Sequence, residues 1–225
     1  MAVALTELNT DEALRYMGCP PERADPATRA LAEWSGQQLL AAAQPRWTWR
    51  TFELTFEAGG VRLDCGLLLP GADLKAHLTG CRRAVLFCAT LGAQVDALIR
   101  RCESGDMARA FALDACAAAA VEQVCDAIEA ELQHQFPGCF FPFRYSPGYG
   151  DLPLSLQNEL LTLLDAPRRV GLTASDTHIL IPRKSVTALL GVADHPVERT
   201  KRSCLSCPGQ AGCPYRKAGG HCGIS

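Results

Sequence analysis

The sequence predicts an α+β fold in which helices pack on a twisted antiparallel sheet. Stretches with the three- and four-residue hydrophobic spacing of helices are mixed with stretches that have the two-residue spacing of strands. No regular strand–helix–strand alternation is present, which argues against a parallel sheet. With 225 residues, of which 48% are hydrophobic and 20% charged, we expect one large domain over residues 1–200 and a cysteine-rich tail over residues 201–225.

The first half of the chain predicts helices followed by strands. Residues 9–43 have helical spacing, interrupted by a proline-containing segment, and Asn9 or Thr10 is positioned to cap the first helix. Over residues 52–67 the spacing changes to two, and a central Gly-Gly pair predicts the turn of a β-hairpin. The continuous apolar run at 83–89 is typical of a buried central strand.

The second half begins with helices and ends with strands. A helix is predicted over residues 93–103, and Asp106 is positioned to cap a long helix after it. The apolar residues of the long helix recur at helical spacing and indicate a core face; they are Ala117, Val121, Val124, Ile128 and Leu132. After a loop rich in Pro, Gly and aromatic residues, we expect a helix over 154–166, ended by a proline, and strands within 168–175 and 177–192.

Composition and charge exclude several classes of function. A formal net charge of −2 leaves no broad basic surface for nucleic acid. No window approaches the ~18 consecutive apolar residues of a membrane-spanning helix. The N-terminus contains acidic residues and lacks the basic and apolar regions of a signal peptide, so we expect a cytoplasmic protein.

The twelve cysteines are unevenly distributed. In a reducing compartment, thiols or metal ligands are more common than a disulfide framework. Eight cysteines stand singly, often within apolar runs, and we interpret them as small core side chains. These eight are Cys19, Cys65, Cys81, Cys88, Cys102, Cys116, Cys125 and Cys139. The other four lie in the tail.

The loop at residues 144–149 combines groups suited to binding a small ligand. Arg144 supplies a bidentate cation, Gly148 lets a ligand approach the main chain, and Tyr149 adds an aromatic ring. These groups match a small anionic or zwitterionic ligand. On their chemistry alone, a tight surface turn with a solvated arginine is the alternative interpretation.

Four motifs follow one another from this loop onward. Arg-x-x-Pro-Gly-Tyr at residues 144–149 is followed by Leu-Leu-Asp at 163–165, Gly-x-Thr at 171–173 and Pro-x-x-Ser-Val at 182–186. The ordered set resembles the activation domain of cobalamin-dependent methionine synthase. The resemblance covers about residues 107–192, whereas the first hundred residues match only in general character.

The resemblance implies a domain that binds S-adenosylmethionine and presents its methyl group to the cobalt of cobalamin. Arg144 would bind the carboxylate of the ligand. Backbone at Ser146 and Gly148, with Tyr149 beside it, would line the ligand. Glu122 corresponds to an acidic residue of the family on the preceding helix, although a solvated position on the helix face is its alternative interpretation. One arginine and at least one carboxylate would satisfy the carboxylate, ammonium and sulfonium charges of S-adenosylmethionine.

The sequence also departs from the family. An acidic N-terminal contact of the family has no counterpart that we place here, and after Val192 an aromatic segment with a further ligand-contacting tyrosine is absent. Methyltransferase and cobalamin-binding modules are absent too. We therefore expect a free-standing activation subunit that reactivates a separate methionine synthase or related corrinoid protein, with an electron-donor protein as a further partner. The alternative is a zinc-stapled, non-catalytic partner of a corrinoid methyltransferase.

The tail has the cysteine spacing of a metal site. Cys204, Cys207, Cys213 and Cys222 form the pattern Cys-x2-Cys-x5-Cys-x8-Cys, and the intervening Pro and Gly residues let a short chain fold around a metal. Because the wider gaps do not repeat Cys-x2-Cys, we favour a 4Fe–4S cluster over zinc, with redox-active thiols or a disulfide as a third interpretation. His221 is interpreted as a surface residue. Our hypothesis is that the tail delivers the electron that reactivation consumes.

Overall fold

A five-stranded antiparallel sheet forms the centre of the structure, a computed structural model that describes residues 3–197. The strand order is β3-β2-β1-β4-β7, and each neighbouring pair is antiparallel. The strands are β1 (Arg46–Glu57), β2 (Gly60–Leu63), β3 (Leu68–Pro70), β4 (Arg83–Thr90) and β7 (Ser185–Val192). A separate two-stranded sheet pairs β5 (Thr173–Ala174) with β6 (Leu180–Ile181). The predicted α+β class with an antiparallel sheet is confirmed.

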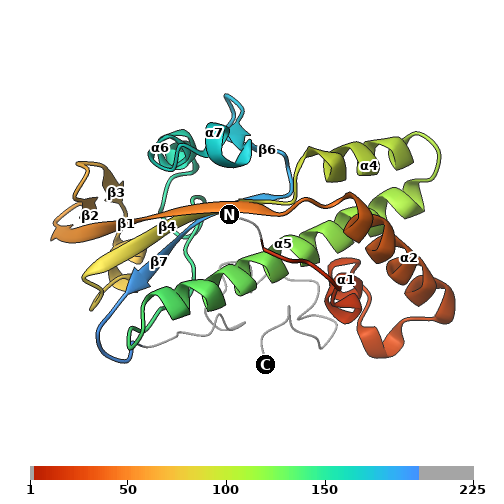
Figure 1. Cartoon of the computed structure of the whole chain (residues 1–225), viewed down its shortest axis with the longest axis horizontal. Coiled ribbons are helices and arrows are strands. Elements are labelled where there is room, and N and C mark those ends of the chain that lie inside the picture. Colours follow the sequence, from red (N-terminus) through yellow and green to blue (C-terminus); the bar gives the residue numbers. More distant parts are fainter. Residues whose placement is uncertain (1–2, 198–225) are drawn as a thin grey trace.

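Helices cover both faces of the main sheet, and Figure 1 shows α5 along one face with α6 and α7 over the other. The helices of the first face are α1 (Thr10–Tyr16), α2 (Pro26–Ala42), α4 (Ala93–Glu103) and α5 (Met107–Gln135). Those of the second face are α3 (Ala72–His77), α6 (Gln157–Leu163) and α7 (Ala166–Val170). Two short 3-10 turns are η1 (Pro21–Arg23) and η2 (Leu154–Leu156). The sheet therefore separates two hydrophobic cores.

Strand β4 contributes to both cores, because successive side chains of a strand point to opposite faces. Val85, Phe87 and Ala89 are buried in the core that contains α5, whereas Leu86 and Cys88 are buried in the core that contains α6 and α7. A strand buried on both faces reads as a continuous apolar run instead of an alternating one. The sequence prediction of a buried central strand is confirmed.

Helix α5 runs across the sheet as the longest element among the described residues. The Asp106 side chain accepts a hydrogen bond of 3.0 Å from the Arg109 amide, as expected of an N-cap. All five apolar residues predicted to form its core face are buried. The opposite face of α5 remains available for polar groups, and it carries the acidic residues of the candidate site.

The prediction of a strand within residues 168–175 was partly wrong. Residues 168–170 belong to helix α7, and only Thr173 and Ala174 form a strand. Pro167 lies in the first turn of α7, where its missing N–H leaves no helical hydrogen bond unmade. The proline thus starts a short helix after the left-handed residue Asp165, which has φ of 49°.

The interpretation of the eight single cysteines as core side chains holds for four of them. Cys81, Cys88, Cys116 and Cys125 are buried, three others are half-buried, and Cys65 is exposed, so the prediction was wrong for Cys65. Burial raises the pKa of Cys81 to about 11 and that of Cys116 to about 12, so these thiols are neutral at pH 7. They fill space and carry no charge.

Gly191 of β7 offers a test of how closely the second core packs against the sheet. A Cβ at this position would lie 2.5 Å from Cys81 Sγ and 3.0 Å from both Leu78 Cδ2 and Pro142 Cγ. We expect Gly191→Ala to lower the free energy of unfolding by about 1–3 kcal/mol through overpacking. Gly59→Ala is the control, because a Cβ there meets nothing within 4 Å. Urea denaturation measures both; equal stability of the two variants would contradict this close packing.

Candidate functional site

The candidate site lies at the outer edge of β7, where the chain from Phe140 to Tyr145 runs beside the strand. Tyr145 and Leu189 exchange two backbone hydrogen bonds of 2.9 and 2.8 Å, and Phe140 and Ala193 exchange two of 2.9 and 3.0 Å. Because β7 is an edge strand of the main sheet, its outer backbone groups are available for this pairing. The pairing fixes the backbone directly beside Arg144.

A tight turn follows Tyr145. The Tyr149 amide donates to the Ser146 carbonyl at 3.0 Å, and the Gly148 amide donates to the Leu152 carbonyl at 2.9 Å. Gly148 has φ of 88°, a conformation that glycine adopts without steric cost. The ring of Tyr149 is partly exposed and lies edge-on to Tyr145, with centroids 6.0 Å apart. The turn therefore presents its backbone and one aromatic ring to solvent.

Helix α3 holds this loop from the second face of the sheet. His77 Nε2 lies 2.6 Å from the Phe143 carbonyl oxygen, to which it donates, and its ring lies 5.0 Å from that of Tyr145. Asp151 Oδ2 accepts hydrogen bonds of 2.5 and 3.1 Å from the amides of Ala72 and Asp73. The loop is thus attached to α3 on both sides of its turn.

Arg144 extends to α5 and meets three carboxylates there. Its Nη2 donates to Glu122 Oε2 at 2.6 Å, and its Nη1 donates to Asp126 Oδ1 at 2.8 Å and to Glu129 Oε1. Residues 122, 126 and 129 are separated by four and three positions, so they lie on one face of the helix. The Arg144 side chain is only 20% exposed, which makes these ion pairs stronger than surface pairs.

The charge around Arg144 is negative on balance. Burial by itself lowers the pKa of Arg144, but the neighbouring acidic groups, Cys125 together with the carboxylates of Glu122, Glu129 and Asp126, raise it overall, so the guanidinium stays a cation. One positive charge faces three carboxylates. Such a site can bind a ligand that carries both a carboxylate, for the guanidinium, and a positive group, for the remaining acidic side chains.

Tyr16 of α1 lies near the same charges. Burial raises the pKa of its hydroxyl, and the negative charge of Glu122 raises it further. The Arg15 guanidinium stacks over its ring at 4.7 Å from the centroid. Helix α1 therefore contributes an aromatic residue to the surroundings of Glu122, one that the sequence interpretation did not include.

Comparison with known proteins identifies the architecture. No protein-family model matches the sequence, and no curated protein matches it. Among solved structures, the crystal structure of the MetH reactivation domain bound to AdoHcy superimposes with a TM-score of 0.63 at 13% identity. The match covers 96% of this chain and 82% of that one. The chain has the fold of the MetH reactivation domain.

Within this reactivation-domain fold, the structure brings together two of the residues predicted from sequence. Arg144 and Glu122 form an ion pair, so Glu122 is not simply a solvated helix position. Ser146, Gly148 and Tyr149 form the turn after Arg144. Their role in ligand binding stays a prediction, because the fold alone assigns no ligand contact.

Sequence interpretation missed four residues that position the loop or Arg144. They are Asp126 and Glu129 on α5, His77 on α3, and Asp151 after the turn. The spacing of Asp126 and Glu129 relative to Glu122 was visible as an acidic helix face. His77 and Asp151 left no signal, because their partners are 66 and 79 residues away in the chain.

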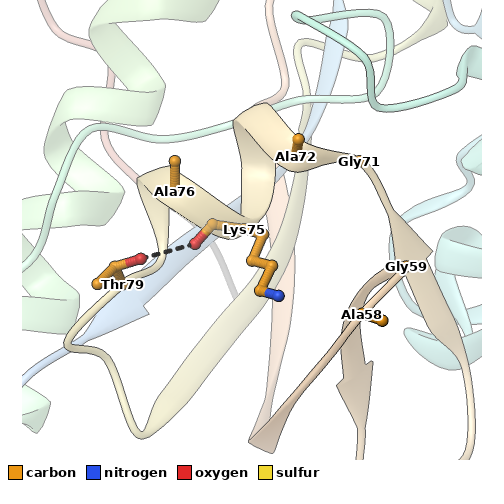
Figure 2. A pocket seen from close by; sticks show the side chains of 7 residues that line it. All are labelled: Ala58, Gly59, Gly71, Ala72, Lys75, Ala76 and Thr79. Carbon is orange, nitrogen blue, oxygen red and sulfur yellow. Dashed lines mark hydrogen bonds between the residues drawn. The ribbon is translucent and has the colours of Figure 1, made fainter.

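An open hollow of about 380 Å³ lies beside α3 (Figure 2). It is lined by Ala58, Gly59, Gly71, Ala72, Lys75, Ala76 and Thr79. Its one charged group, the Lys75 ammonium, already donates to the Glu57 carbonyl at 2.7 Å, and Thr79 Oγ1 donates to the Lys75 carbonyl at 3.0 Å. The hollow contains none of the predicted site residues.

The predicted metal ligands Cys204, Cys207, Cys213 and Cys222 lie outside the described residues. Within residues 3–197, no group of three or more His, Cys, Asp or Glu side chains is arranged to hold a metal ion. In the same part of the chain, no helix is both long and apolar enough to cross a membrane. The metal prediction thus rests on the tail sequence alone.

Asp151 provides a pH-dependent test of how the loop is attached. Desolvation raises its pKa, but the hydrogen bonds from the amides of Asp73 and Ala72 outweigh this, so the pKa is lower than usual. A lowered pKa in the folded state means that the carboxylate stabilises the fold above its ordinary pKa of about 3.9, and that this contribution is lost as pH falls through the folded pKa.

We therefore expect Asp151→Ala to lower the midpoint of thermal unfolding by a few degrees at pH 7. The difference from wild type should shrink below pH of about 4. Asp176→Ala, at an exposed position, is the control. A difference that stays constant from pH 7 to pH 3 would show that the charge of Asp151 does not hold α3 and the loop together.

Proposed function

We propose that the chain is a reactivation subunit that binds S-adenosylmethionine and presents its methyl group to the cobalt of a cobalamin held by a separate protein. The observation that carries the proposal is the ion pair between Arg144 of the predicted loop and Glu122 of α5, within a MetH reactivation-domain fold. The loop motif and the fold are independent arguments, because the motif was identified without the structure.

The charges of the site suit this ligand. S-adenosylmethionine carries a carboxylate, an ammonium and a sulfonium. Arg144 would bind the carboxylate, Glu122 would bind the ammonium, and the turn from Ser146 to Tyr149 would line the ligand. The solved MetH domain is bound to AdoHcy, the compound that remains when S-adenosylmethionine gives up its methyl group. This supports a ligand of the same class here.

The chemistry of reactivation needs one electron and one methyl group: the electron reduces inactive cob(II)alamin, and the methyl group of S-adenosylmethionine passes to the cobalt. The protein side chains described here need not transfer a proton. Their task would be to orient the ligand and to hold its charged end, so that the methyl group faces the partner's cofactor.

The partner would be a cobalamin-dependent methionine synthase or a related corrinoid protein. Methyl transfer to cobalt needs a cobalamin-binding protein, and we propose that a separate protein supplies it. For the tail, we propose a 4Fe–4S cluster, or else zinc, held by Cys204, Cys207, Cys213 and Cys222, with the cluster delivering the electron.

Replacement of Arg144 tests the ligand and the reaction together. We expect the wild-type chain to bind S-adenosylmethionine in calorimetric titration and to support S-adenosylmethionine-dependent remethylation of a cob(II)alamin methionine synthase. Arg144→Ala should weaken binding about 10- to 100-fold, because a charge-assisted contact is lost. Arg168→Ala, at an 86% exposed side chain, is the control.

Absence of binding to the wild-type chain would overturn the proposal. Binding of the corrinoid protein without any S-adenosylmethionine-dependent remethylation would instead favour the non-catalytic partner.

The metal content of the tail is tested by anaerobic purification. We expect brown protein that contains iron and sulfide and whose visible absorbance decreases on reduction. A Cys204→Ser, Cys207→Ser variant should lose the iron, whereas Cys65→Ser, at an exposed position in the folded domain, should keep it. Colourless protein with stoichiometric zinc would contradict electron delivery by the tail.

A further inference from the structure

The two terminal nitrogens of Arg144 have different partners. Nη1 contacts Asp126 and Glu129, whereas Nη2 contacts Glu122 alone among the contacts within the described residues. We infer that Glu129, assisted by Asp126, is a positioning residue that fixes Arg144 through Nη1, and that Glu122 is the partner which a ligand carboxylate displaces from Nη2. The inference rests on the proposed function for the identity of the ligand.

Burial distinguishes the fixed partner from the exchangeable one. The Glu129 side chain is 14% exposed, whereas that of Glu122 is 38% exposed. Separation of Glu129 from the guanidinium would pull apart two opposite charges that are both poorly hydrated, which is costly. Glu122 loses less on separation, because water reaches it. Asp126 is 70% exposed, so its contact is weakened by solvent and adds only support.

The backbone on either side of Arg144 is fixed as well. Tyr145 is paired with Leu189 of β7, and the Phe143 carbonyl accepts a hydrogen bond from His77. With the backbone and Nη1 both held, an exchange at Nη2 requires no movement of the loop. A guanidinium that is already ordered loses little conformational entropy when a ligand binds.

The exchange also keeps the charges paired, which defines the class of ligand. When a ligand carboxylate takes Nη2, Glu122 is released beside the ligand and needs a new cation. An α-amino acid group supplies that cation through its ammonium, so one ion pair is replaced by two. A carboxylate ligand without an ammonium would only exchange one ion pair for another. The site therefore selects the zwitterionic amino acid group.

Calorimetric titration with two ligands tests this division of roles. S-adenosylmethionine carries the carboxylate, and its decarboxylated analogue keeps the amine and the sulfonium but lacks the carboxylate. Because Glu129 holds Nη1 of the arginine that would bind the ligand carboxylate, we expect Glu129→Gln to weaken S-adenosylmethionine binding about tenfold and analogue binding by less than about twofold. Glu122→Gln should weaken the binding of both ligands, since both carry the amine.

Glu131→Gln is the matched control, because Glu131 lies on the same helix and its side chain accepts a hydrogen bond from Gln135. If Glu129→Gln lost its folding in general, the binding of both ligands would be weakened. Thermal unfolding of each variant identifies such a loss of folding. If Glu129→Gln does not fold, Asp126→Asn at the exposed position carries the same comparison, with an expected loss of about threefold for S-adenosylmethionine alone.

The outcomes separate this inference from the proposed function. If the wild-type chain does not bind S-adenosylmethionine, the proposed function and the inference are both overturned. If it binds and Arg144→Ala weakens binding, the proposed function stands. In that case unchanged or tighter binding by folded Glu129→Gln, or equal weakening of both ligands, overturns the inference alone.

Discussion

The pairing of β7 on both of its edges determines where the candidate site is. One edge pairs with β4 over eight residues from Ser185 to Val192, which fixes β7 against the strand that is buried in both cores. The other edge pairs with Phe140 and Tyr145. Because α5 packs in the core on one side of the sheet and α3 in the core on the other, a loop held at this edge is within reach of both helices.

The residues around Arg144 make contacts on both sides of the sheet. Phe141 is buried in the core of α5, while Tyr145 packs against the core of α3 and α6. The Arg144 side chain points to the acidic face of α5, and the preceding carbonyl is bound by His77 of α3. The backbone that carries Arg144 is therefore held by residues of both cores. The residues of the ion-pair cluster themselves belong to neither core.

The main features of the fold could be predicted from sequence because they depend on long local patterns. Strand β4 was visible as a run of apolar residues, and α5 as a buried stripe with a capping Asp106. Short elements such as α3 and β3 have too few residues to establish a period. Pro167 was taken as the end of a helix, since sequence alone does not distinguish a proline that ends one helix from a proline in the first turn of the next.

For the candidate site, sequence reasoning named candidate residues but not the contacts between them. Arg144 was predicted from the loop motif and Glu122 from the preceding helix; the two form an ion pair, while their role in ligand binding stays a prediction. The contacts of Glu129 and Asp126 were not predicted, because an acidic residue on an exposed helix face is usually solvated. The position of the loop on β7 brings the Arg144 cation to that face, and this position depends on backbone pairing between distant segments.

The low sequence identity to the MetH reactivation domain can be understood from the different requirements that a core and a charged site place on the sequence. A sheet buried on two sides requires apolar residues of suitable volume, and many sequences meet that requirement, so 13% identity is compatible with a shared fold. A half-buried arginine is different, because its charge must be balanced by particular carboxylates at particular positions. The excess of negative charge on the acidic face of α5 favours a ligand that carries more positive groups than negative ones.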